Sequence, residues 1–334
     1  DKHFLGMLGM HGTYEANLAM HGCDLMLNLG ARFDDRVTGL ISGFSPNSTK
    51  IHCDIDPSSV NKNVAVDLAV IGDATKILEA LIAEMKKRKF KPHKTSLDKW
   101  WSQIEVWRKR DCLRFNQTGS IIKPQHAIKR LCEMTAERDV YVTTEVGQHQ
   151  MWAAQYFDFH LPNRWMTSGG LGTMGYGLPA ALGVQVAHPG ATVIDIAGEA
   201  SFMMNMQELS TLSQYNLPVK MFIINNEWMG MVRQWQELIH GGRYSESYSA
   251  SLPDFRKLAD TFNMTGLVAQ SSDDLDSVIT QMLDTPGPVI ADIRVAKEEN
   301  CFPMIPSGAA HNDMLLGPED QAEKPVSEEG MVLV

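Results

Sequence analysis

Hydrophobic residues in the later part of the chain come in short runs that alternate with longer amphipathic stretches. The runs are rich in β-branched side chains and occupy residues 140–144, 192–197, 219–224 and 288–293. Continuous apolar runs of this length are typical of strands that are buried on both faces. The stretches between them are long enough for helices, and Pro124 suits the first turn of a helix over 124–137. The alternation predicts a parallel sheet with helices on both faces.

The first part of the chain repeats this alternation on a smaller scale. It predicts strands at residues 24–30, 50–56 and 64–71. Asp73 is placed to cap a helix that runs to about residue 89, because its side-chain oxygen can accept a hydrogen bond from the first turn. A further helix, packed on a domain surface, is predicted from apolar residues at helical spacing, which are Trp100, Trp101, Ile104 and Trp107.

Together these elements predict an α/β fold with two doubly wound parallel-sheet domains. We expect part of one domain at residues 1–85 and a second domain at 121–310, joined by a linker and a connecting helix at 86–120. Residues 311–334 are expected to form a polar tail on the surface. The chain starts at Asp1 with neither an initiator methionine nor a signal peptide, so we expect a fragment whose N-terminal part is missing.

The composition excludes several classes of protein. Of the 334 residues, 44% are hydrophobic and 21% are charged, which is ordinary for a globular protein and argues against a disordered, collagen or coiled-coil chain. No apolar run approaches the length of a membrane span, and a net charge of −10 argues against a general nucleic-acid binder. The five cysteines are scattered without a CxxC pair, so neither a disulfide framework nor a zinc site is predicted. Free thiols are typical of a reducing compartment, and we expect a cytoplasmic protein.

Two polar residues follow two of the predicted strands directly. Glu199 comes after strand 192–197 and Asn226 after strand 219–224, and the 27 positions between them fit one strand–helix–strand crossover. Both side chains are therefore expected at the carboxyl edge of the sheet, where open α/β sheets bind ligands. Carboxylate and amide oxygens suit Mg²⁺, and the helix that starts near Ser201 offers N–H groups to a phosphate. This pattern predicts a Mg²⁺–diphosphate site, although both residues also fit ordinary loop and cap positions.

A glycine-rich segment at residues 170–175 matches the pattern GxGxxG, and Asp195 lies 20 positions beyond Gly175. Such a pattern suggests a dinucleotide-binding turn only when it follows a buried strand. Residues 163–168, which precede it, are polar and short, and they make a poor buried strand. We therefore favour a glycine-rich loop that allows close approach of the backbone over a nicotinamide dinucleotide site.

The sequence resembles one enzyme family in several separate motifs. Residues 198–202, followed by Asn225 and Asn226, resemble the thiamine-diphosphate motif, in which GDG precedes a later NN. The resemblance becomes specific to one family through five further segments, which are residues 8–12, 30–39, 147–152, 168–175 and 230–235. Together they are similar to the catalytic (large) subunit of acetohydroxyacid synthase, also called acetolactate synthase, from the start of the chain to about Gly308.

The resemblance implies a thiamine-diphosphate site in the second domain. It implies that Mg²⁺ is held by the side chains of Glu199 and Asn226 and by the backbone oxygen of Trp228. The remaining residues that it places on the cofactor are Gln148, His149, Gly172, Met174, Ala200, Ser201, Gly230 and Met231. Met174 would be the apolar wedge beneath the thiazolium that bends the cofactor, although packing in the core is the simpler role for a methionine.

The resemblance also implies that the first segment is the second half of an FAD-binding middle domain. The flavin-contacting positions would be Gly9, Met10, His11, Gly12, Gly30, Ala31, Arg32, Phe33, Asp34, Asp54, Ile55, Asp73 and Ala74. Arg36 and Trp235 match positions that select the second substrate. A guanidinium suits a carboxylate, and an indole suits an ethyl side chain, while a surface ion pair and a core tryptophan are the alternatives.

The activity that the resemblance implies is that of a transferase in valine, leucine and isoleucine biosynthesis. A hydroxyethyl unit from pyruvate, carried on thiamine diphosphate, condenses with pyruvate or 2-oxobutyrate, and CO₂ is released. Family members are homo-oligomers with the active site at a dimer interface, and we expect a small regulatory subunit as a further partner. The alternatives are a pyruvate oxidase, a 2-oxo-acid decarboxylase, or a fragment that binds cofactor without turnover.

The sequence departs from the family pattern in two places. Glu199 replaces the usual aspartate, and Ala197 and Ala200 stand where glycine is usual, which puts the metal geometry in question. The chain also lacks a match to the family's N-terminal domain, which carries the glutamate that protonates N1′ of the aminopyrimidine. By this resemblance the chain alone is expected to be inactive.

Overall fold

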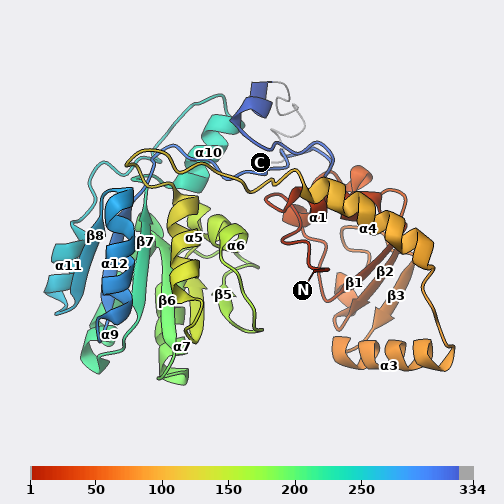
Figure 1. Ribbon diagram of the computed structural model, residues 1–334, viewed down its shortest axis with the longest axis horizontal. Helices are drawn as coiled ribbons and strands as arrows, with labels where there is room; N and C mark the ends of the chain where they lie inside the picture. The colour runs from red at the N-terminus through yellow and green to blue at the C-terminus, as the bar shows by residue number, and fades with distance from the viewer. Residues whose placement is uncertain (1, 323–334) are drawn as a thin grey trace. The chain divides into compact units, whose positions relative to one another are not determined.

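The computed structural model describes residues 2–322, which form two compact units (Figure 1). One unit comprises residues 2–114 together with 302–322, and the other is Phe115–Cys301. Among the described residues, no helix has the length and apolar character needed to cross a membrane.

The first unit is built on a parallel three-stranded sheet in the order β1-β2-β3. Its strands are β1 (Leu25–Leu29), β2 (Thr49–Asp54) and β3 (Leu68–Ile71). Its helices are α1 (Tyr14–Gly22), α2 (Asp35–Thr38), α3 (Ala74–Lys87) and α4 (Lys94–Arg108), with short 3-10 turns η1 (Ile41–Gly43), η2 (Pro57–Ser59) and η4 (Pro318–Ala322). As predicted, the Asp73 side chain caps α3, because it accepts a hydrogen bond from the Lys76 N–H.

Two expectations about this unit are wrong in detail. The strand predicted from residue 64 begins only at Leu68, because side-chain oxygens bind the backbone before it: Asn61 accepts from the Val66 N–H. The polar tail is not all on the surface, since His311, Met314 and Leu315 are buried and His311 bonds the Val37 carbonyl at 2.7 Å. Residues 323–334 of the expected tail lie outside the described residues.

The second unit contains a six-stranded, wholly parallel sheet in the order β5-β4-β6-β7-β9-β8. The strands are β4 (Val140–Thr144), β5 (Trp165–Thr167), β6 (Thr192–Gly198), β7 (Lys220–Asn225), β8 (Thr265–Ala269) and β9 (Val289–Arg294). β4, β6, β7 and β9 are the four strands that the apolar runs predict. β5 and β8 were not predicted, because β5 has three residues and β8 contains Gly266.

Helices cover both faces of this sheet, which confirms the doubly wound α/β fold (Figure 1). One face packs against α5 (Pro124–Thr135), α6 (Gln148–Tyr156) and α12 (Ser272–Asp284). The other face packs against α7 (Gly177–Ala187), α8 (Glu199–Met203), α9 (Leu209–Tyr215) and α11 (Phe255–Thr261). The 3-10 turn η3 (Met206–Glu208) precedes α9, and α10 (Gly230–Leu238) follows β7. Along β6, Ile194 and Ile196 enter one core while Val193 and Ala197 enter the other, so the strand is buried on both sides.

Candidate functional site

The carboxyl ends of three adjacent strands bring together the polar residues of the second unit. β6 and β7 pair in parallel with Gly198 opposite Ile224, so Glu199 and Asn226 follow neighbouring strands as predicted. β4 lies on the other side of β6, and Gln148 begins helix α6 shortly after β4 ends. The sequence order of strands and helices therefore places three separate segments at one sheet edge.

These segments line a single cavity. The residues that the family resemblance assigns to thiamine diphosphate and its metal all lie on its wall, namely Gln148, His149, Gly172, Met174, Glu199, Ala200, Ser201, Asn226, Trp228, Gly230 and Met231. The wall also includes seven residues that are not among those predicted for the site, namely Val146, Gly147, Trp152, Gly198, Ile224, Met229 and Val232. The cavity thus combines an apolar lining with a few polar groups, as ligand sites commonly do.

Among these polar groups, Glu199 has a buried carboxyl with an oxygen that lacks a hydrogen-bond partner. Its side chain is 1% exposed, and its Oε1 atom has no hydrogen-bond partner. Burial, helped by the nearby Asp292 carboxyl, raises the pKa of this carboxyl to about 8, although N–H groups of Asn226 and Trp228 oppose the shift. A buried carboxylate oxygen without a partner is unfavourable, and a bound cation would relieve this cost. The unpartnered, buried oxygen therefore suits Glu199 to the role of a metal ligand.

Asn226 is held in one orientation by a network of amides. Its Oδ1 atom accepts from the Trp228 N–H at 3.2 Å, and its Nδ2 group donates to Gln148 Oε1 at 3.3 Å. Gln148 in turn donates from Nε2 to Gln234 Oε1 and to the Glu299 carbonyl, both at 2.9 Å. Within the described residues, no group of three or more His, Cys, Asp and Glu side chains could hold a metal ion. A cation at Glu199 would therefore depend on amide, backbone and ligand oxygens.

Two glycines are required by close packing around this network. A Cβ atom on Gly230 would lie 2.0 Å from Gln148 Oε1, and one on Gly198 would lie 2.6 Å from His149 Nδ1. By contrast, Ala197 lies inside β6 and Ala200 inside α8, conformations that alanine adopts freely. Alanine at these two positions therefore leaves the local backbone regular.

His149 contributes a neutral ring to the cavity wall. The imidazole is buried and donates a hydrogen bond to the backbone carbonyl of Glu145, while its Nε2 atom has no partner. Burial lowers the pKa of His149 to about 3, because the imidazolium form loses its hydration. The ring is uncharged at neutral pH and leaves one nitrogen available to a ligand.

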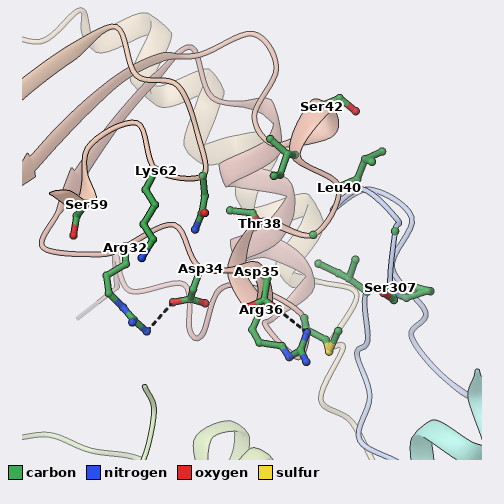
Figure 2. Close-up of a pocket in the computed structure, with 17 residues that line it drawn as sticks. Arg32, Asp34, Asp35, Arg36, Thr38, Leu40, Ser42, Ser59, Lys62 and Ser307 are labelled. Atoms are coloured by element: carbon green, nitrogen blue, oxygen red, sulfur yellow. Dashed lines mark hydrogen bonds and ion pairs between the residues drawn. The ribbon is translucent and has the colours of Figure 1, made fainter. Parts of the chain in front are cut away.

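Trp235 and Arg36, the two residues expected to select the second substrate, do not line this cavity. Trp235 is half-buried on α10, four positions after Met231, so the two side chains share a face of the helix one turn apart. Arg36 lies on α2 in the first unit, where its Nη1 atom bonds Asp35 Oδ2 at 3.0 Å. It lines a separate cavity of that unit, of about 730 Å³ (Figure 2).

Only part of the predicted flavin set lines the cavity of the first unit. Met10, Arg32 and Asp34 do so, and Arg32 faces Asp34 at 3.7 Å (Figure 2). Lys62 and Asn63 also line it, although no motif of the sequence points to them. The remaining predicted residues lie in the same unit but off this wall, namely Gly9, His11, Gly12, Gly30, Ala31, Phe33, Asp54, Ile55, Asp73 and Ala74.

Several of these residues have evident structural roles. Phe33 packs edge-on against Phe44 and His52 in the core of the unit. Gly9 has a φ of +107°, and a Cβ atom there would lie 2.6 Å from the Arg36 carbonyl oxygen, so the position requires glycine. Asp73 caps α3. Ile55, by contrast, is 71% exposed.

Comparison with known proteins assigns both units. Residues 145–293 match the C-terminal TPP binding domain of thiamine pyrophosphate enzymes, and residues 1–81 match the central domain of the same enzymes. The acetolactate synthase large subunit of Haemophilus influenzae is 45% identical over 95% of this chain and 55% of its own length. The acetolactate synthase isozyme 3 large subunit of Escherichia coli is also 45% identical, over 93% and 55%, and the large subunit of Porphyra purpurea is 45% identical over 94% and 53%. The chain spans about half the length of these curated relatives.

Proposed function

The chain belongs to the thiamine pyrophosphate enzymes, and on that premise we propose that the protein carries out the acetolactate synthase reaction. Pyruvate loses CO₂, and its remaining two carbons join a second 2-oxo acid, either pyruvate or 2-oxobutyrate. The products would be 2-acetolactate and 2-aceto-2-hydroxybutyrate, which precede valine, leucine and isoleucine. The observation that carries the proposal is the buried, unpartnered Glu199 oxygen in a cavity within the matched TPP-binding segment.

Mg²⁺ would be held by Glu199 and Asn226 through their side-chain oxygens and by Trp228 through its backbone oxygen. Glu199 offers an oxygen that has no other partner, and the Asn226 amide is already oriented by Gln148 and the Trp228 N–H. The cation would bind the diphosphate of the cofactor, because Mg²⁺ commonly combines one or two protein oxygens with phosphate oxygens. Glutamate has one methylene more than aspartate, which the buried start of α8 has to accommodate.

The remaining cavity residues would orient the cofactor and exclude water. When bound, thiamine diphosphate supplies the carbon nucleophile and the electron sink. Met174 presents a half-buried apolar side chain, which we propose supports the thiazolium ring. His149 stays neutral, so it offers Nε2 for hydrogen bonding without adding charge. We assign Ser201, Ala200, Gly172, Gly230 and Met231 to the wall that surrounds the cofactor.

Two residues are proposed to choose the second substrate. Arg36 has an exposed guanidinium on a cavity wall, which suits the carboxylate that all 2-oxo acids share. Trp235 lies one helical turn beyond Met231, and its indole can contact the additional methyl group of 2-oxobutyrate.

FAD is proposed to bind the first unit. The cavity of about 730 Å³ has the size of a typical ligand site, and Arg32 and Lys62 give it cationic groups that suit a diphosphate. Because the net reaction involves no change in oxidation state, the flavin would have a structural role.

We also propose that the protein forms a homo-oligomer with the active site at a dimer interface. Helix α7 is apolar on all sides, and such helices are normally buried, yet Gly183, Val186 and Ala187 are exposed on it. Leu171, in the loop before α7, is also 92% exposed, and we propose that these exposed apolar residues contact a second copy. The relatives are called large subunits, which supports a smaller regulatory partner.

Five free cysteines fit a cytoplasmic location.

The reaction itself is tested with the full-length protein, pyruvate, thiamine diphosphate, Mg²⁺ and FAD. We expect 2-acetolactate as the main product, and 2-aceto-2-hydroxybutyrate when 2-oxobutyrate is added. Acetaldehyde or acetate in place of these products would overturn the proposal in favour of a decarboxylase or an oxidase.

A further inference from the structure

Glu145 is a fully buried carboxylate to which the proposed function gives no role. It follows β4, and its Oε2 atom accepts a hydrogen bond from the Gly175 N–H at 2.6 Å while Oε1 accepts from the Leu178 N–H at 3.1 Å. These N–H groups lie at the start of α7, where the first turn has no partners within the helix. Tyr176, at the N-cap position, makes no side-chain capping hydrogen bond. Glu145, which directly follows β4, therefore caps α7.

The backbone of Glu145 is bonded on both sides as well. Its N–H donates to the Ile196 carbonyl in β6 at 3.1 Å, and its carbonyl accepts from the His149 ring. Its side chain binds Gly175, which directly follows Met174 in the chain. One residue thus connects the segment that carries Met174 to the ring of His149, and both of these side chains line the cavity.

A second buried carboxyl lies against the same helix start. Asp195 is opposite Thr143 in the β4–β6 register, and its Oδ1 atom accepts from the Thr143 hydroxyl at 3.0 Å. A Cβ atom on Gly177 would lie 2.3 Å from this oxygen, so helix and carboxyl are in close contact. Burial raises the pKa of both carboxyls, and the nearby Glu145 carboxyl also raises the pKa of Asp195, while the backbone N–H groups at the start of α7 oppose the rise in the pKa of Glu145.

We propose that Glu145 is a positioning residue of the cofactor site, which caps α7 and thereby holds Met174 and His149 in place on the cavity wall. The inference rests on the proposed function, since it concerns the same cavity, but it adds a residue that does not itself line the wall. If Glu145 acts in this way, it influences cofactor affinity through Met174. A residue that only stabilises the fold would show no such dependence on Met174.

A double-mutant cycle on cofactor affinity tests the proposal. Thiamine diphosphate is titrated with Mg²⁺ by calorimetry into the wild-type chain, Glu145→Gln, Met174→Ala and the double variant. Glutamine has the same shape but turns an NH₂ donor toward one of the two backbone donors, so we expect at least tenfold weaker binding. The double variant is expected to bind no more than about threefold more weakly than the weaker single variant, because independent effects would multiply.

Lys220→Met serves as the matched control. Lys220 is also buried, and its Nζ group donates to the Thr285 and Gly287 carbonyls at 2.6 and 2.7 Å, beyond the end of α12. It starts β7, whereas the cavity lies at the opposite end of that strand. Its replacement removes a buried ionisable group that also makes two hydrogen bonds to the backbone, yet we expect cofactor affinity to stay within twofold of the wild type.

Each outcome decides the inference. If Glu145→Gln does not fold, Glu145→Asp keeps the carboxylate at shorter reach and enters the same cycle with the same expected coupling. Affinity within twofold of the wild type, multiplying effects in the double variant, or an equal loss in Lys220→Met would overturn positioning by Glu145. No binding to the wild-type chain would instead overturn the proposed function on which the inference rests.

Discussion

Replacing Glu199 by glutamine should make the metal-free protein more stable while removing its metal ligand. The carboxyl is 1% exposed and one of its oxygens has no partner, so its ionised form is poorly solvated in the folded chain. Glutamine has nearly the same shape and cannot ionise. The residue would then be one that the site retains for binding at a cost in stability.

The size of this effect follows from the pKa of Glu199, which is raised from 4.5 to about 8. Because the folded state holds the proton more tightly than the unfolded state, the stabilising contribution is complete below about pH 4.5 and declines as the pH rises toward 8. At pH 7 the difference amounts to about 3 kcal/mol, at about 1.4 kcal/mol for each pH unit above the ordinary value. Glu199→Gln should therefore stabilise the metal-free chain by about 3 kcal/mol at pH 7 and by nearly nothing at pH 4.5.

Urea unfolding in the presence of a chelator, followed by circular dichroism at both pH values, measures this difference. Glu137→Gln is a suitable control, because Glu137 is an exposed glutamate of the same unit and should show no pH-dependent gain. A glutamine variant at position 199 that is equally stable or less stable than the wild type at pH 7 would refute the reasoning, since the carboxylate would then be adequately solvated or paired.

Three further predictions concern the two cavities. Gly230→Ala should weaken Mg²⁺-dependent binding of thiamine diphosphate at least about tenfold by calorimetry, because its Cβ atom would lie 2.0 Å from Gln148 Oε1; unchanged affinity would show that the amide network is dispensable. In the full-length protein, Trp235→Leu should lower the preference for 2-oxobutyrate over pyruvate about tenfold in a competition assay, since it removes about 1–2 kcal/mol of contact with one methyl group. An unchanged product ratio at high activity would make Trp235 a packing residue. Arg32→Ala should weaken flavin binding, measured by fluorescence, more than Arg88→Ala on the exposed end of α3, and equal affinities would remove Arg32 from the flavin site.

Much of the second unit could be predicted because its strands are buried on both faces. Continuous apolar runs marked β4, β6, β7 and β9, and the parallel order then placed Glu199 and Asn226 together. β8 was missed because Gly266 interrupts it, and β5 because it is short and pairs only with β4. Local patterns carry little information about such edge strands.

Other parts of the molecule depend on contacts between residues far apart in sequence. Glu145 carries the same signal as Glu199, a carboxylate directly after a buried strand, yet its role is visible only once α7 is seen to start against it. Similarly, the cavity of the first unit is completed by Ile305 and Ser307, which lie more than 240 positions after Lys62 in the chain. Residues 302–322 therefore pack within a unit that the strand pattern limits to the first part of the sequence.

The central claim is that the cavity at the ends of β4, β6 and β7 binds thiamine diphosphate through a metal held by Glu199. Calorimetric titration of thiamine diphosphate into the chain, with Mg²⁺ and then with a chelator, tests it most directly. We expect saturable binding that requires Mg²⁺, is lost in Glu199→Ala and is kept or strengthened in Glu199→Asp. Binding of equal affinity in Glu199→Ala, or no binding by the wild-type chain at any Mg²⁺ concentration, would contradict it.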